Sequence, residues 1–260
     1  MRFYIIILLL FAVLISKAQT QKQWAIWNER ESLGYTDTVL YKKDYKDKYS
    51  AYNYSGIWTA RNNLNIVGFI GNNYQRIRIK FISITKESTS PDSYFVIGKT
   101  MVKNTICNFK GEIKITNIKL YKHLVLGYGE EGIVKKRGIL FGDYCFNEDS
   151  TQKNSGIFKG SFSSCWFIDN KGQLCYDSLG YTSDAYCNNQ FAGVWQQYNS
   201  QKTETCNWGD DRIPFSKDFD WGTGEFYPNK KYLNNGWESY KVDNYDEVIK
   251  AEKKYEKWWK

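Results

Sequence analysis

The stretch QRIRIKFISI, residues 75–84, decides the fold class of this chain. In its first seven residues Ile77, Ile79 and Phe81 alternate with three basic side chains. A period of two predicts a β-strand with one buried face and one solvated face. The apolar phase then moves by one residue to Ile82. Such a slip turns the side chains to the other face, so it predicts a β-bulge or a bend near Phe81.

Similar short runs separated by turns extend over residues 53–200. The clearest hairpin signal is the turn Asp169-Asn170-Lys171-Gly172. An aromatic-x-Gly pattern also recurs without a fixed period, for example at Phe158-Lys159-Gly160 and Phe191-Ala192-Gly193, and predicts strand bends at which an aromatic ring covers a glycine. Because helical periodicity is missing here and the chain has only three prolines, we predict a mainly β fold, an antiparallel barrel or sandwich. The other predicted strands are 57–60, 64–69, 94–102, 107–115, 118–126, 133–141, 157–162, 164–168 and 173–177.

The C-terminus changes period. Tyr245, Val248 and Ile249 share one helical face, although Glu252 interrupts it further on. Asn244, followed by an acidic residue three positions later, fits an N-cap with a capping box. We therefore predict that residues 201–260 form a loop-rich segment that ends in an α-helix packed on the β domain of residues 53–200.

The N-terminus has the pattern of a signal peptide. Arg2 precedes an apolar run, and Ser16-Lys17-Ala18 supplies small residues at a cleavage site before Gln19. The apolar run of about 13 residues is shorter than the roughly 20 that span a bilayer. Residues 1–18 are therefore predicted to be removed, which leaves an N-terminal extension at 19–52 on an exported protein, periplasmic or secreted, with no membrane span.

The six cysteines agree with export, since all of them follow residue 100. An even number in an exported chain predicts up to three disulfides of unknown pairing, with inert buried thiols as the alternative. No Cys-x-x-Cys pair occurs, and His123 is the single histidine, so we expect no metal site and no cofactor. The cysteines are Cys107, Cys145, Cys165, Cys175, Cys187 and Cys206.

Composition and charge narrow the partners. The 260 residues are 42% hydrophobic and 18% aromatic, which excludes a disordered chain or a coiled coil. The net charge of +8 falls to +6 when Arg2 and Lys17 are removed. Both signs are mixed along the chain, as in residues 42–48, so with export we expect no nucleic-acid partner. An acidic polysaccharide or an anionic membrane surface remains open, as does a merely solvated lysine-rich surface.

The stretch from Thr205 to Tyr227 concentrates tryptophans, carboxylates and glycines, a loop composition that often carries function. Its carboxylates and indoles suit a glycoside hydrolase, which needs two carboxyl groups at a set separation. A calcium site is a second interpretation, but with Asp218 as the first position of the loop Gly222 falls at the fifth, where the calcium loop needs an acid. The third is structural: Arg212 pairs with an aspartate and the tryptophans close the core. The candidate site residues are Trp195, Trp208, Asp210, Asp211, Arg212, Asp220, Trp221 and Glu225.

Two resemblances follow from these motifs. Gly56-Ile57-Trp58 and Gly193-Val194-Trp195 resemble the Gly-x-Trp first-strand signature of lipocalin-like barrels, which also end with a helix. Residues 188–195, 206–214 and 222–226 resemble a group of uncharacterised exported β-rich proteins of Bacteroidota. The second resemblance implies export and a β-rich fold, and it carries no activity.

Enzyme signatures are sparse, since the chain has no Gly-x-Ser-x-Gly elbow, phosphate loop or dinucleotide fingerprint in a strand-to-helix context. We therefore expect a non-catalytic binding protein that recognises an extracytoplasmic ligand, a glycan or another cell-surface component. The alternatives are a glycan-degrading hydrolase that uses the loop carboxylates, and a structural or protein-interaction component of the envelope. An aromatic-lined barrel mouth would favour a small ligand. The sequence leaves the oligomeric state open.

Overall fold

The computed structural model describes residues 40–124, 126, 130, 132–184, 186–242 and 244–260. The predicted signal peptide, and residues 19–39 of the predicted extension, lie outside this part of the chain. Among the helices of the described residues, none has the length and apolar character needed to cross a membrane.

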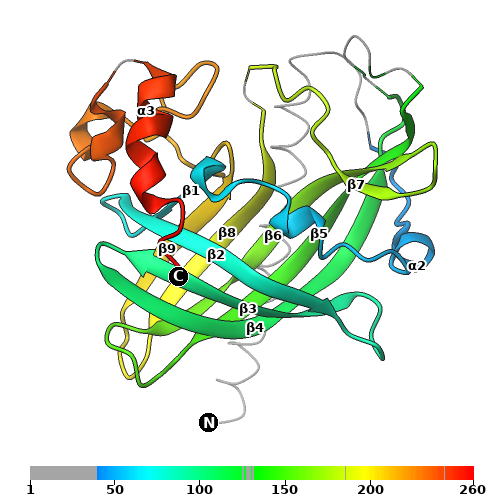
Figure 1. Cartoon of the computed structure of the whole chain (residues 1–260). Helices are drawn as coiled ribbons and strands as arrows, with labels where there is room; N and C mark the ends of the chain where they lie inside the picture. Colours follow the sequence, from blue (N-terminus) through cyan, green and yellow to red (C-terminus); the bar gives the residue numbers. More distant parts are fainter. Residues whose placement is uncertain (1–39, 125, 127–129, 131, 185, 243) are drawn as a thin grey trace.

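The described residues form one antiparallel sheet, and eight of its strands close into a barrel (Figure 1). Each of the eight pairs with a neighbour on both sides in the order β1-β2-β3-β4-β5-β6-β8-β9, and β9 returns to β1. The short β7 pairs with the end of β6, beyond the residues that pair with β8. The predicted mainly β, antiparallel fold is thus confirmed. The strands are β1 Ile66–Ile70, β2 Gln75–Lys86, β3 Ser93–Val102, β4 Thr105–Leu120, β5 Val134–Glu148, β6 Gly156–Asp169, β7 Leu174–Tyr176, β8 Asn188–Gln197 and β9 Thr203–Asp210.

Strand β2 has the expected alternation, and its register against β3 shifts between Phe81 and Ser83, which confirms the predicted bulge. Its apolar side chains face the barrel interior. The basic face is not solvated, however: Arg76 and Arg78 are only 3% and 7% exposed. The reason is tertiary, because the C-terminal segment covers the outside of β2, a contact that no local pattern encodes.

Other predicted strands have different bounds. Residues 57–60 contain a 3-10 helix, Ile57–Thr59, rather than a strand. The predicted strand 107–115 and the first three residues of the predicted strand 118–126 belong to one strand, β4, which ends at Leu120 and has a register shift between Ile115 and Asn117. Strands β8 and β9 lack an alternating pattern because five consecutive residues of each are buried. When both faces of a strand are buried, its sequence does not alternate between apolar and polar residues.

Aromatic side chains fill the barrel. Phe191 stacks on Phe162 and Trp208, with ring centroids 5.0 and 4.8 Å apart. One end of the barrel is closed by the chain that precedes β1. There Tyr54 and Trp58 are buried, and the Trp58 indole donates a 3.0 Å hydrogen bond to Ser164 of β6. The opposite end of the barrel is open and contains a pocket.

The C-terminal segment packs on the outside of the barrel around its own apolar cluster (Figure 1). Val67 and Phe69, on the outer face of β1, contribute to this cluster together with Trp237 and Val248. The closing helix α3, Tyr245–Glu252, confirms the predicted helix, and Asn244 caps it by accepting the backbone N–H groups of residues 246 and 247. A 3-10 helix, Lys253–Tyr255, follows it.

No disulfide joins the cysteines in the described part of the structure, so the disulfides expected from the sequence are not present. For the five cysteines that lie in strands the registers agree with this, since none of them places one cysteine opposite another. Cys107, for example, lies opposite Thr100, and Cys206 lies opposite Gly193. Burial raises the pKa of the Cys107 thiol to about 11 and keeps it protonated. Cys107 and Cys206 match the alternative of buried thiols, whereas the other four cysteines are half-buried.

Candidate functional site

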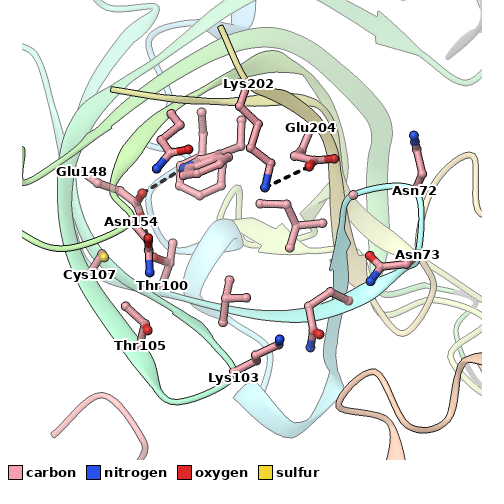
Figure 2. Close-up of a pocket in the computed structure, with 17 residues that line it drawn as sticks. Asn72, Asn73, Thr100, Lys103, Thr105, Cys107, Glu148, Asn154, Lys202 and Glu204 are labelled. Atoms are coloured by element: carbon pink, nitrogen blue, oxygen red, sulfur yellow. Dashed lines mark hydrogen bonds and ion pairs between the residues drawn. The ribbon is translucent and has the colours of Figure 1, made fainter. Parts of the chain in front are cut away.

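Four hairpin turns surround the open end of the barrel. They join β1 to β2, β3 to β4, β5 to β6, and β8 to β9, and each contributes side chains to one pocket of about 660 Å³ (Figure 2). We call this the mouth pocket. Its volume lies within the ~300–1,000 Å³ typical of small-molecule sites. Antiparallel strands bring every second turn of the chain to the same end, which is why residues from four separate turns meet here.

Glu148, the last residue of β5, lies at the floor of the mouth pocket with Trp195 of β8. Its carboxylate accepts three hydrogen bonds, from Thr100 Oγ1 at 2.5 Å, the backbone N–H of Gly156 at 2.9 Å and the Trp195 indole at 3.0 Å. The donors come from β3, β6 and β8. A single carboxylate therefore fixes the shape of the floor.

The electrostatics of this carboxylate combine two opposing effects. Burial raises the pKa of Glu148, and the hydrogen bonds from Thr100, Trp195 and Gly156 oppose that rise. The net direction is upward. Glu148 is thus a buried acid whose position is fixed by hydrogen bonds. Its Oε1 accepts one hydrogen bond, from Thr100, and can accept a second.

The rim of the mouth pocket is polar. It is rich in side-chain amides, which both donate and accept hydrogen bonds. Lys202 and Glu204 form an ion pair at 3.2 Å at the start of β9, and Lys103 lies on the β3–β4 turn. Phe158 and Trp195 supply apolar surface below. The amides are those of Asn72, Asn73, Gln75, Asn154 and Gln197.

The residues singled out from the sequence do not gather at one place. Trp195 lies at the floor of the mouth pocket, with 7% of its surface exposed. Trp208 lies inside the barrel, 2% exposed and stacked on Phe191. Its ring is therefore part of the core.

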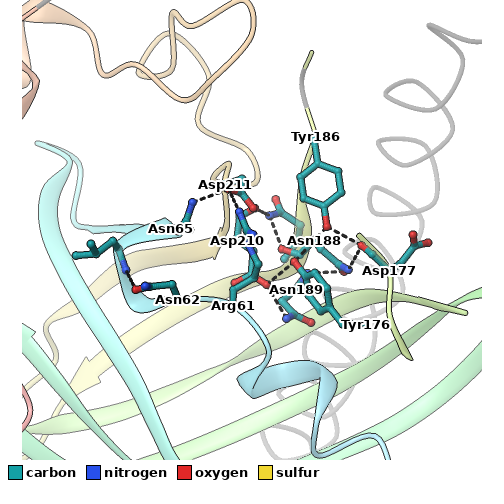
Figure 3. Close-up of polar contacts among 12 residues, drawn as sticks. Arg61, Asn62, Asn65, Tyr176, Asp177, Tyr186, Asn188, Asn189, Asp210 and Asp211 are labelled. Atoms are coloured by element: carbon teal, nitrogen blue, oxygen red, sulfur yellow. Dashed lines mark hydrogen bonds and ion pairs between the residues drawn. The ribbon is translucent and has the colours of Figure 1, made fainter. Parts of the chain in front are cut away.

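Asp210 and Asp211 lie at the closed end of the barrel, where β9 finishes (Figure 3). Asp210 accepts hydrogen bonds from Tyr176 at 3.0 Å and Asn189 at 2.7 Å. Burial, followed by the charge of Asp211, raises the pKa of Asp210 to about 8. Asp211 is ion-paired at 2.6 Å with Arg61 rather than with Arg212. These contacts tie β9 to the chain before β1 and to the region of β7 and β8.

Arg212 organises the surface loop that follows β9, as the structural interpretation of this stretch expects. It donates to Asp220 at 2.7 Å and to the carbonyls of Gly222 at 2.9 Å and Gly224 at 2.6 Å. In the same loop Trp221 is 67% exposed and Glu225 is exposed. The candidate set is thus divided among the mouth pocket, the core, the closed end and this loop.

Most of the mouth pocket was missed in the sequence because its residues come from turns far apart along the chain. The residues Gly71-Asn72-Asn73 have the composition of a turn, but the sequence does not show which other turns share its end of the barrel. Glu148 was missed because the predicted strand 133–141 stops seven residues before it, whereas β5 continues to Glu148. Successive turns between antiparallel strands lie at alternate ends of the sheet. Assigning the predicted turns to the two ends in this way would have grouped the four turns of the mouth pocket.

Within the described residues, no group of three or more His, Cys, Asp or Glu side chains is placed to hold a metal ion. Comparison with known proteins finds no family model, no curated protein and no solved structure that matches this chain. The geometry of the mouth pocket and of the polar contacts at the closed end is therefore the basis for a function.

Proposed function

We propose that the protein is a non-catalytic binding protein, exported as its N-terminus predicts, which holds a compact hydroxyl-rich ligand in the mouth pocket. One or two units of a glycan fit this description. The observation that carries the proposal is the pocket of about 660 Å³, enclosed by four hairpins above a floor made by Glu148 and Trp195.

The chemistry of the lining supports a sugar-like ligand. Hydroxyl groups donate and accept, as do the five amides of the rim, and Glu148 can accept one further donor. The apolar faces of a sugar ring suit contact with Phe158 and Trp195 at the floor. Small-molecule sites commonly combine such apolar surface with a few placed polar groups.

A pair of adjacent substitutions tests the location. Thr105 lines the mouth pocket, whereas Ile106, the next residue of β4, is 38% exposed outside it. We expect Thr105→Trp to abolish retention on a panel of cell-surface and plant polysaccharides, and Ile106→Trp to leave it unchanged. Equal retention by both variants, with both folded by circular dichroism, would place the ligand elsewhere.

The same samples distinguish the other classes of protein. Glu148 and Glu204 both line the mouth pocket, and two carboxylates are what a glycoside hydrolase needs. Release of reducing ends that stops in Glu204→Gln would make the protein an enzyme. A folded protein with neither retention nor release would favour a protein partner or a structural role in the envelope.

A further inference from the structure

Two arginines on the outer face of β2 share one carboxylate. Glu252, at the end of α3, accepts from Arg76 at 3.1 Å and from Arg78 at 2.6 Å through the same oxygen. Its other oxygen accepts a short hydrogen bond from Ser239. All three charged side chains are less than 10% exposed. The cluster therefore carries one positive charge in excess, in a place where unpaired charge is costly.

Aromatic rings hold the two guanidinium groups in position. Arg76 lies over Trp237 at 4.2 Å and Arg78 over Tyr255 at 3.8 Å. Ring faces attract a cation, but they leave the edge of a guanidinium available for hydrogen bonds. Burial and the neighbouring Arg76 charge lower the pKa of Arg78, which is the electrostatic sign of uncompensated positive charge.

A pocket of about 270 Å³ opens beside this cluster, between the β2–β3 pair and the C-terminal segment. We call it the basic pocket. Its lining includes Arg76, Arg78 and Lys103 as cations, and the exposed Glu238 is its one acidic residue. Asn104 and Asn234 add amide donors. Guanidinium, ammonium and amide groups together suit a carboxylate or another oxyanion.

The basic pocket adjoins the mouth pocket. Gln75 and Lys103 line both of them. Lys103 is exposed on the β3–β4 turn, and the described part of the chain shows no ion pair for it, whereas Lys202 on the opposite hairpin is paired with Glu204. A ligand seated in the mouth can therefore extend an acidic group past Lys103 toward Arg78.

We infer that the ligand of the mouth pocket is an acidic carbohydrate of the uronic acid class, whose carboxylate binds in the basic pocket between Lys103 and Arg78. The inference rests on the proposed binding function and adds the charge of the ligand to it. The sugar ring occupies the amide-lined mouth, and its carboxylate supplies the second anion that the arginine pair lacks.

The test uses pairs of disaccharides that differ only in charge: the uronates of glucose, galactose and mannose, each with its neutral counterpart. Titration calorimetry at constant ionic strength measures both members of each pair on the full mature protein. For at least one pair we expect the uronate to bind about tenfold more tightly than the neutral sugar, the gain typical of one charge-assisted contact.

Lys103→Asn is the informative variant. Lys103 has φ +55°, a left-handed conformation that asparagine tolerates well, so the turn is retained while the charge is removed. We expect this variant to lose the roughly tenfold preference for the uronate, measured as the ratio of uronate affinity to neutral-sugar affinity within each pair. Lys110→Asn, an exposed position on β4 away from both pockets, removes the same charge and serves as the control.

The outcomes separate the two proposals. If uronate and neutral sugar bind equally well, or if Lys103→Asn and Lys110→Asn reduce the uronate preference alike, the inference about charge is wrong and the binding function stands. If Thr105→Trp fails to change retention and no disaccharide binds, the mouth pocket is not the binding site and both proposals are wrong.

Discussion

The indole N–H of Trp195 donates to the Glu148 carboxylate at 3.0 Å and so joins β8 to β5 across the strand that separates them. With the bonds from Thr100 on β3 and Gly156 on β6, one carboxylate connects four strands at the barrel mouth. The floor of the mouth pocket is therefore pre-formed, which lowers the ordering cost of binding a ligand.

The first prediction concerns this carboxylate. In Glu148→Gln the amide oxygen can still accept from the Trp195 indole and the Gly156 N–H. The N–H₂ group then faces Thr100 Oγ1, so the Thr100 hydroxyl must turn and loses its charge-assisted bond to the carboxylate. We expect the free energy of unfolding to fall by about 1–3 kcal/mol, measured by urea denaturation. Glu204→Gln, at the rim and ion-paired with Lys202, should change it by at most about 1 kcal/mol. Equal effects of the two substitutions would show that Glu148 does not hold the mouth together.

The second prediction concerns Glu252. Burial alone would raise the pKa of this carboxyl, but the charges of Arg76 and Arg78 lower it to about 2, from an ordinary 4.5. Since the pKa is depressed in the folded state, the stabilisation is complete above about pH 4.5 and is lost as the pH falls through about 2. Each unit corresponds to about 1.4 kcal/mol, so about 3 kcal/mol is at stake.

We expect Glu252→Gln to lose about this amount at pH 7 and to show a flatter decline of stability between pH 5 and pH 2 than the wild type. Glu256→Gln is the control, an exposed position four residues along the chain. Denaturant unfolding across this pH range measures both. A wild-type acid profile that Glu252→Gln leaves unchanged would mean that the arginine pair does not depend on this carboxylate.

The third prediction has the opposite sign. Burial and the charge of Asp211 raise the pKa of Asp210 to about 8. A raised pKa in the folded state contributes stability that is complete below about pH 3.8 and is lost as the pH rises to about 8. In Asp210→Asn the amide oxygen can still accept from Tyr176 and Asn189, and no charge can form.

We therefore expect Asp210→Asn to match the wild type near pH 4 and to become progressively more stable than it up to pH 8. Thermal melts at five pH values test this, with the exposed Asp184→Asn as the control. A variant that is less stable than the wild type throughout would indicate that the charged form of Asp210 is the one the fold uses.

Local patterns in the sequence were sufficient for elements whose environment is local. The alternation at Ile77, Ile79 and Phe81 predicted the inward face of β2, and the end of this alternation after Phe81 predicted the bulge within the strand. Asn244 predicted the start of α3 because an N-cap acts within one turn. The outer face of β2 was predicted to be solvated, since nothing within ten residues of Arg78 reveals that a helix about 170 positions away covers it.

The candidate site shows the same division. Trp195 was selected from the sequence and lies in the mouth pocket, but Glu148, Thr100 and Lys103 belong to other strands and turns that only the closure of the barrel brings together. Glu252 appeared in the helical pattern as an interruption of the apolar face. Its physical reason is the pair of buried arginines, which requires a carboxylate at that position.

The last prediction concerns Tyr144, whose ring covers a pair of glycines inside the barrel. Gly160 and Gly193 lie opposite each other on β6 and β8. A Cβ on either one would come within 2.7 Å of the Tyr144 hydroxyl. A Cβ on Gly193 would also lie 2.1 Å from the carbonyl oxygen of Lys159. The residue that covers these glycines comes from β5 and belongs to neither of the two aromatic-x-Gly motifs that contain them.

The Tyr144 hydroxyl itself is buried and makes no hydrogen bond within the described part of the chain. We therefore expect Tyr144→Phe to be neutral or to stabilise the fold by up to about 1 kcal/mol. Gly193→Ala should destabilise it by about 2 kcal/mol or more through overpacking, measured by thermal and urea unfolding. In the double variant the loss should persist, because the methyl group still meets the Lys159 carbonyl. Full recovery by Tyr144→Phe would show instead that the hydroxyl alone excludes a side chain at Gly193.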